Sequence, residues 1–190
     1  MNLSPKFEQP PQYAVLIHAF QKPKDTEIPY LAHLLGVVSI ALQHGANEGE
    51  AIGAPLHDAG EDVGADGRVE DIRHRFGDAV AEIVQGCTDA VAIPKPPWQK
   101  RKEDYIAQVP KASASVRLVS ASDKLHNARA LLRNFRRLGD ALWPRFTGGK
   151  EGTLWNYRAL VTAFRKAESD ELIAEVDSVV FDLEQLAATS

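Results

Sequence analysis

The sequence predicts an all-α fold, a single compact bundle of about eight to ten helices that forms one domain over residues 1–190. Apolar residues recur at helical spacing, most clearly between residues 113 and 137. No stretch alternates apolar and polar residues for several positions, as the strands of hairpins do. The chain has 190 residues, of which 44% are hydrophobic, and this is enough for one full core. Together, these observations favour a helical bundle over a fold that contains a sheet.

The N-terminal part is expected to hold a loose arm and two helices. Residues 1–11 are polar and rich in proline, which favours the arm. A short helix is predicted over residues 13–20, and it ends in a run of helix breakers at 21–27. Pro29 suits the first turn of the next helix, which stops near Gly45. The apolar stripe of that helix comprises Leu31, Leu34, Leu35, Val38 and Leu42.

A third helix is expected to begin at Asn47, because Asn47 and Glu50 have the spacing of a capping box. It would continue through residues 51–62. Pro55 lies inside this range, and an internal proline costs about 3 kcal/mol through a lost hydrogen bond and a steric clash. We therefore expect a kink or a break between residues 51 and 55.

The rest of the chain is predicted to be helical as well, with a break at Gly77. The longest helix has an apolar stripe that comprises Leu118, Ala121, Leu125, Ala128, Leu132 and Phe135. The predicted helical ranges are 69–76, 78–88, 98–108, 113–137, 153–166 and 169–187. The segment 167–190 is therefore expected to pack on the domain as a C-terminal helix.

Composition excludes several classes of protein. The net charge of −4 argues against nucleic acid as a partner, because general nucleic-acid binders are usually basic. No stretch approaches 18 apolar residues, so no membrane span is expected, and the polar start predicts no signal peptide. The single cysteine, Cys87, excludes a disulfide within the chain and fits a cytoplasmic location. A homo-oligomer is left open.

The stretch around residue 57 concentrates polar groups behind an apolar lead-in. His57, Asp58, Glu61 and Asp62 occupy six positions after Leu56. A globular protein seldom places adjacent His and Asp directly after an apolar residue unless they are paired, buried or bound to something. On a helix, residues three and four apart lie on one face, so these groups would point into one region.

His33, His57, Asp58 and Asp123 are candidate metal ligands, because each lies among apolar neighbours in the sequence. Two imidazoles and two carboxylates suit Mn²⁺, Fe²⁺ or Zn²⁺ better than Ca²⁺ or Mg²⁺. An open coordination position would acidify a water and so supply a nucleophile.

Each of these signals has a plainer interpretation when taken alone. A single His33 in an apolar helix is more often a core residue, and His57 with Asp58 could be an ion pair. Glu61 and Asp62 could be a solvated helix end. Beside a metal, however, they would be natural general bases, and the four signals together favour a metal site.

Several short motifs surround these residues. They read His57-Asp58-x-x-Glu61-Asp62, Phe76-Gly77, Cys87-Thr88-Asp89 and Asp123-Lys124-Leu125-His126-Asn127. With the pattern His33, His57-Asp58, Asp123, they resemble the HD-domain metal-dependent phosphohydrolases, and among these the hydrolase domain of RelA/SpoT-type enzymes. The segments 28–33 and 155–157 look most like stand-alone small alarmone hydrolases. The resemblance covers about residues 13–165.

The resemblance implies an HD-domain bundle and a 3′-pyrophosphohydrolase that degrades guanosine tetra- and pentaphosphate in the stringent response. It implies Mn²⁺, or another divalent transition metal, at His33, His57, Asp58 and Asp123. It also implies that Glu61 and Asp62 are the catalytic residues that activate or orient the water. Residues expected to contact the substrate are Lys24, Arg101, Lys102, Asn127 and Tyr157, with a core role as the equal alternative for Tyr157.

One departure from the family concerns the base-binding segment. The family usually carries an Arg-Lys pair before Pro-Tyr, whereas this chain has Pro23-Lys24. Proline cannot supply a planar guanidinium with five donors, so base selectivity is the property most affected. An HD-type phosphatase acting on another nucleotide such as NADPH is the first alternative function. A non-catalytic nucleotide-binding module is the second, although such a module has no need of both the ligands and the Glu-Asp pair.

Overall fold

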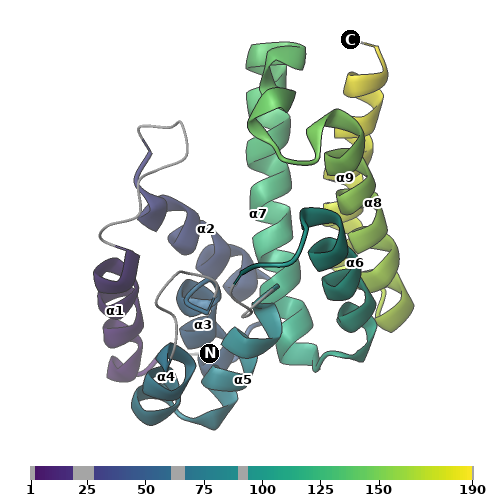
Figure 1. Cartoon of the computed structure of the whole chain (residues 1–190). Helices are drawn as coiled ribbons and strands as arrows, with labels where there is room; N and C mark the ends of the chain where they lie inside the picture. Colours follow the sequence, from purple (N-terminus) through teal and green to yellow (C-terminus); the bar gives the residue numbers. More distant parts are fainter. Residues whose placement is uncertain (1–2, 19–27, 61–66, 90–93, 190) are drawn as a thin grey trace. The chain divides into compact units, whose positions relative to one another are not determined.

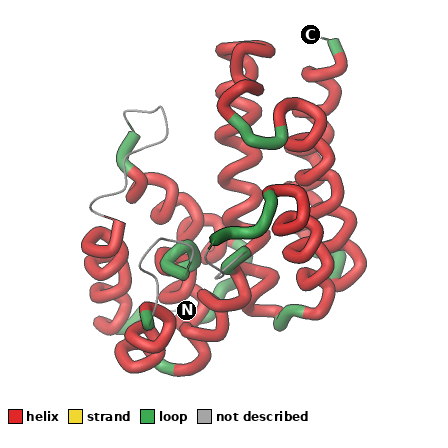
Figure 2. Tube along the Cα trace, viewed as in Figure 1, coloured by secondary structure: helices red, strands yellow, loops and turns green. Residues whose placement is uncertain are grey.

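The computed structural model describes residues 3–18, 28–60, 67–89 and 94–189. Within these ranges it contains nine α-helices, α1 to α9, and four short 3₁₀ segments, η1 to η4 (Figure 1). Figure 2 shows helix and connecting loop, and no strand, across the same part of the chain. The predicted all-α fold of eight to ten helices is confirmed. No described helix is both long and apolar enough to cross a membrane.

The chain divides into two compact units. The first comprises Met1–Val91 with Ser113–Ser122, and the second comprises Ala92–Ala112 with Asp123–Ser190. Each unit has a hydrophobic cluster of its own. The sequence predicts one domain over residues 1–190, and this stays a prediction.

The first unit contains the helices that come before residue 91 and the start of the longest helix. Its elements are η1 (Pro5–Glu8), α1 (Gln9–His18), α2 (Tyr30–Gln43), α3 (Glu48–Gly53), η2 (Ala54–Leu56), α4 (Arg68–Phe76), α5 (Asp78–Cys87) and the first turns of α7 (Ala114–Leu138). Pro29 is the N-cap of α2 and does not lie in its first turn. The predicted break at Gly77 is confirmed, since this residue ends α4 and begins α5 with a φ of 92°.

The N-terminal segment is more ordered than the predicted loose arm. Ser4 caps η1 by accepting a hydrogen bond from the backbone N–H of Lys6, and its own N–H donates to Glu48 Oε1 at 2.6 Å. Helix α1 then begins at Gln9 and tolerates Pro10 in its first turn, where an amide hydrogen has no intrahelical partner. Proline content therefore gave the wrong expectation for residues 5–11.

The chain around Pro55 follows one prediction and departs from another. The capping box of Asn47 and Glu50 is present, and α3 ends at Gly53, so the predicted break before residue 56 is confirmed. The chain tightens into η2 and then into turns over residues 57–60. The expected third helix does not continue through these residues. Residues 61 and 62 lie outside the described part of the chain.

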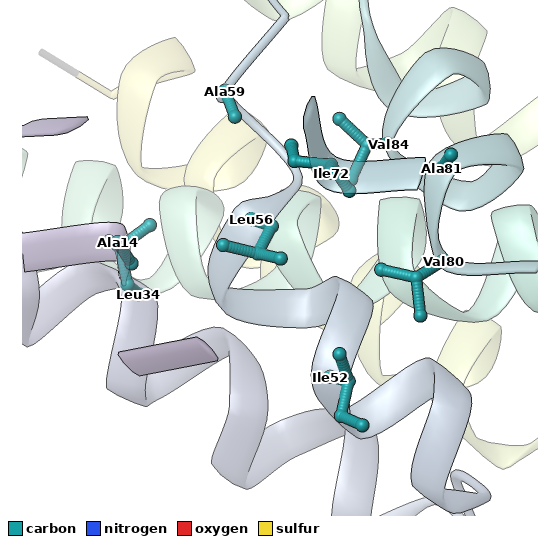
Figure 3. Close-up of a cluster of buried hydrophobic side chains, with 9 residues drawn as sticks. All are labelled: Ala14, Leu34, Ile52, Leu56, Ala59, Ile72, Val80, Ala81 and Val84. Carbon is teal, nitrogen blue, oxygen red and sulfur yellow. The ribbon is translucent and has the colours of Figure 1, made fainter. Parts of the chain in front are cut away.

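The core of the first unit surrounds the segment that leads into His57 and Asp58. Figure 3 shows side chains from several helices gathered around this segment. The cluster comprises Ala14, Leu34, Ile52, Leu56, Ala59, Ile72, Val80, Ala81 and Val84. Leu56 and Ala59, on either side of His57 and Asp58, are both 0% exposed. Their burial anchors both ends of the polar turn.

The second unit is helical, and its longest helices are α7, α8 and α9. Its elements are α6 (Trp98–Gln108), η3 (Val109–Lys111), the rest of α7, η4 (Gly139–Arg145), α8 (Gly149–Ala167) and α9 (Glu171–Ala188). Helices α8 and α9 lie side by side (Figure 1). Arg158 of α8 joins them by donating to Glu184 and Asp177 of α9. The hydrophobic core cluster of this unit comprises Leu131, Leu132, Phe135, Leu142, Trp143, Leu183 and Ala187.

Two adjacent leucines of α2 provide a test of this packing. Leu34 is 1% exposed and Leu35 is 49% exposed, although both belong to the predicted apolar stripe. We expect Leu34→Ala to lower the free energy of unfolding by about 2–5 kcal/mol through lost burial and a residual cavity. Leu35→Ala should change it by less than about 0.5 kcal/mol. Urea unfolding of the metal-free chain measures both, and equal effects would contradict the assigned orientation of α2.

Candidate metal centre

Three of the predicted ligands converge in the first unit. His33 comes from α2, whereas His57 and Asp58 come from the turn that follows η2. One ligand atom from each residue lies within 4.8 Å of the other two. The Nε2 atom of His57 is 3.2 Å from Asp58 Oδ1, and His33 Nε2 is 3.8 Å from Asp58 Oδ2. Residues 24 positions apart in the sequence thus form one group with two nitrogen donors and a carboxylate.

The hydrogen bond of His57 determines which of its nitrogens can bind a metal. His57 Nδ1 lies 2.7 Å from the carbonyl oxygen of Ala54. A carbonyl only accepts, so Nδ1 donates the hydrogen and the lone pair of the neutral ring is on Nε2. This is the arrangement in which a backbone carbonyl orients a metal-binding imidazole.

The group therefore fits a cation. The Nε2 lone pair of His57 and an oxygen of Asp58 are both acceptors, yet they lie 3.2 Å apart. A positive charge, from a proton or a metal ion, removes the repulsion between them. Mixed imidazole and carboxylate donors suit a divalent transition ion, so the His33–His57–Asp58 group could bind a divalent metal.

Exposure differs across the group. The side chain of His57 is 2% exposed, that of His33 is 15% exposed and that of Asp58 is 25% exposed. The group is thus closed behind His57 and open to solvent beside Asp58. Asp58 is thus the most solvent-exposed member of the group.

The fourth predicted ligand, Asp123, belongs to the second unit, where it is 4% exposed. Its Oδ2 accepts a hydrogen bond from Lys124 Nζ at 2.5 Å, and its Oδ1 accepts one from Asn127 Nδ2 at 2.6 Å. A buried carboxylate is costly unless it is paired, and these two donors satisfy it. Lys124 is thus an ion-pair partner of Asp123.

Tyr157 shares the surroundings of Asp123. The pKa of its phenol is raised, first because the group is buried and second because the Asp123 carboxylate is near; Lys124 opposes the shift. Like any tyrosine at neutral pH, the phenol is protonated, and the raised pKa keeps it so at higher pH. Asn127 lies one turn after Asp123 on α7, as predicted, and its amide orients that carboxylate.

Arg101 and Lys102 lie in the first turns of α6, both partly exposed. Their neighbour Lys100 pairs with Asp104 on the same helix. The start of α6 is fixed by Trp98, whose ring lies against Gly148 and stacks edge-on to Trp155 with ring centroids 6.2 Å apart. This contact sets the position of the basic helix within the second unit.

The remaining predicted site residues are Lys24, Glu61 and Asp62, which lie outside the described residues. Sequence reasoning assigned no role to two residues that the structure places beside the group, Tyr30 and His18. The Tyr30 hydroxyl donates to Asp58 Oδ2, and the His18 ring lies 4.9 Å from the Tyr30 ring. Tyr30 precedes His33 by three positions, a spacing that indicates a shared helix face; His18 carries no such signal.

The chain is similar in sequence to a known domain family and to several characterised proteins. The HD domain profile matches residues 11–154. Guanosine-3′,5′-bis(diphosphate) 3′-pyrophosphohydrolase MESH1 of Drosophila melanogaster is 36% identical over 134 residues, 69% of this chain and 72% of that protein. MESH1 of Danio rerio is 38% identical over 124 residues, 64% of this chain and 66% of that protein.

A solved structure extends the similarity over nearly the whole chain. It is described as a metazoan ortholog of SpoT that hydrolyzes ppGpp and plays a role in starvation responses. The two structures share a TM-score of 0.78 and 28% sequence identity, over 98% of this chain and 99% of the other. The all-helical arrangement is therefore that of a known fold.

Replacing Asp58 tests the metal centre. Asp58→Asn keeps the size of the side chain but removes its charge, so metal affinity should fall by more than the roughly 10–100-fold typical of losing an outer partner. Titration calorimetry with Mn²⁺ measures the change. Asp71→Asn is the matched control, because Asp71 is a carboxylate of the same unit that bonds Tyr13. Equal affinities in the two variants would remove Asp58 from the ligand set.

A second substitution tests the contact between Trp98, at the start of α6, and Gly148. A Cβ at Gly148 would lie 2.6 Å from a ring carbon of Trp98, while the φ of −81° at Gly148 suits any residue. Gly148→Ala should therefore destabilise the chain by about 1–3 kcal/mol through overpacking. Adding Trp98→Phe should recover part of this loss in a double-mutant cycle. Additive effects of the two changes in urea unfolding would show that the two residues are not in contact.

Proposed function

Since the chain belongs to the HD-domain family and is a relative of the MESH1 enzymes, we propose that it is a metal-dependent 3′-pyrophosphohydrolase of guanosine tetra- and pentaphosphate. It would convert the tetraphosphate and water to GDP and pyrophosphate, and so degrade the alarmone of the stringent response. The observation that carries the proposal is that His33, His57 and Asp58 lie together in one group that could hold a metal ion.

The proposed cofactor is Mn²⁺, held by His33, His57, Asp58 and Asp123. The donor set of two imidazoles and two carboxylates supports this choice. When bound, the cation supplies the positive charge that makes a water acidic enough to attack at neutral pH.

The chain's own residues would orient the reactants and move protons. His57 is held in one tautomer by the Ala54 carbonyl, so its Nε2 atom is preorganised. Glu61 and Asp62 follow Asp58 by three and four positions, and one of them would accept the proton of the attacking water. As water adds to the 3′-diphosphate, the bond to the ribose 3′ oxygen breaks, and that oxygen takes up a proton.

Substrate contacts are proposed for Lys24, Arg101, Lys102, Asn127 and Tyr157. The basic residues would stabilise negative charge that develops on the leaving diphosphate. Asn127 keeps its side-chain carbonyl for the ribose while its amide donates to Asp123. Tyr157, with its raised pKa, would donate a hydrogen bond to the nucleotide. We place the reaction in the cytoplasm, where Cys87, which is buried, would remain reduced.

A substrate panel tests the function. Purified protein with Mn²⁺ should release pyrophosphate from guanosine tetraphosphate, and Glu61→Ala or Asp62→Ala should lower kcat by about 10²–10⁴-fold through loss of proton transfer. Glu82→Ala is the control, because Glu82 is an exposed carboxylate of α5. Products are identified by ion-exchange chromatography.

The same panel separates the alternatives. Release of single phosphate from NADPH, with guanosine tetraphosphate untouched, would assign the chain to the phosphatases of other nucleotides. Tight binding of the tetraphosphate without any product would make it a binding module. Either outcome contradicts the proposed reaction.

A further inference from the structure

We propose that Tyr30 is a positioning residue of the metal centre: its hydroxyl fixes the carboxylate of Asp58 for the cation, and the ring of His18 holds the phenol in place. The proposal rests on the metal centre of the proposed function. It assigns a role to a residue that lies outside the ligand set, and its test is metal binding without any substrate.

The two oxygens of Asp58 have different neighbours. Oδ2 accepts a hydrogen bond from the Tyr30 hydroxyl, while Oδ1 lies 3.2 Å from His57 Nε2. With Oδ2 held, the carboxylate cannot rotate freely, so Oδ1 stays directed at the imidazole with which it would share a cation. Asp58 is 25% exposed, and without this hydrogen bond its carboxylate could turn toward solvent. Metal-binding carboxylates are commonly held by such outer partners.

The ring of Tyr30 lies close to two histidine rings. The centroid of its ring lies 4.9 Å from that of His18 and 5.3 Å from that of His33. His18 is 6% exposed and is the last residue of α1. Tyr30 is the first residue of α2, whose N-cap residue, Pro29, makes no side-chain capping hydrogen bond. Tyr30 also packs against the core cluster of the first unit, and the nearby His18 ring is the contact to which we assign the orientation of the phenol.

Tyr13 provides the comparison that separates this role from ordinary packing. Its hydroxyl donates to Asp71 Oδ2 at 2.6 Å and thereby joins α1 to α4 in the same unit. Both tyrosines therefore make one phenol–carboxylate hydrogen bond between different parts of the first unit. Only the bond of Tyr30 ends on a residue of the His33–His57–Asp58 group. A merely structural hydroxyl would affect stability at both positions and metal affinity at neither.

The test compares Tyr30→Phe with Tyr13→Phe. Tyr30→Phe should weaken Mn²⁺ binding by about 10–100-fold, the usual effect of losing an outer hydrogen bond to a ligand. Tyr13→Phe should leave the Mn²⁺ affinity at the wild-type value. Both are measured by calorimetry on the metal-free chain. The visible spectrum of the Co²⁺-loaded protein should change for Tyr30→Phe alone, because it reports on ligand geometry.

Two substitutions of His18, one that removes the ring and one that keeps an aromatic ring without its nitrogens, test its packing role. His18→Ala should weaken Mn²⁺ binding, whereas His18→Phe should retain it, because the proposed role needs a flat ring against Tyr30 and no charge. Equal weakening by both substitutions would contradict the packing role. Thermal unfolding of each metal-free variant shows that the comparison is made between folded chains.

Two outcomes would overturn the role of Tyr30. One is a Mn²⁺ affinity of Tyr30→Phe equal to that of Tyr13→Phe. The other is a raised KM for the nucleotide at unchanged metal affinity, which would assign the hydroxyl to the substrate. If Tyr30→Phe weakens Mn²⁺ binding but the wild-type chain releases no pyrophosphate, only the proposed function is overturned, so the two failures are distinguishable.

Discussion

The metal centre depends on one short contact, the hydrogen bond from His57 Nδ1 to the carbonyl of Ala54. In an unbroken α-helix that carbonyl would accept the backbone N–H four residues on. Helix α3 instead ends at Gly53, and the chain passes through Pro55 in a 3₁₀ turn. The tighter turn brings the imidazole of His57 to the Ala54 carbonyl, and the ring then presents Nε2 to the cation. The proline that disturbs the helix is thus part of how the ligand is oriented.

The polar turn is held rigid by apolar residues on both sides. Leu56 and Ala59 are fully buried in the core of the first unit (Figure 3). Burial of a leucine side chain stabilises a fold by roughly 1.5–3 kcal/mol, so moving the turn would expose apolar surface at a substantial cost. His57 and Asp58 therefore lie on a segment whose flanking residues resist displacement, as a preorganised site requires.

Local signals in the sequence predicted most of the helices and named the three residues that the structure brings together as the His33–His57–Asp58 group. The capping box at Asn47, the break at Gly77 and the apolar stripe of α7 are all properties of a few neighbouring residues. The turn over 57–60 was missed, because where a proline ends a helix and how the chain then continues depend on tertiary packing. The contact between Tyr30 and Asp58 spans 28 positions, and no spacing rule within one helix could reveal it.

The two predicted carboxylate ligands are held in the same chemical manner. At Asp58 a neutral phenol from Tyr30 donates to one oxygen, and the other faces His57. At Asp123 a neutral amide from Asn127 donates to one oxygen, and the other faces Lys124. In each case the neutral donor orients the carboxylate without cancelling its charge, and the second oxygen is directed at a partner that carries, or can share, a positive charge. A hydrogen bond from a neutral donor orients a carboxylate and leaves its negative charge for a cation, as the outer partners of metal-binding carboxylates do.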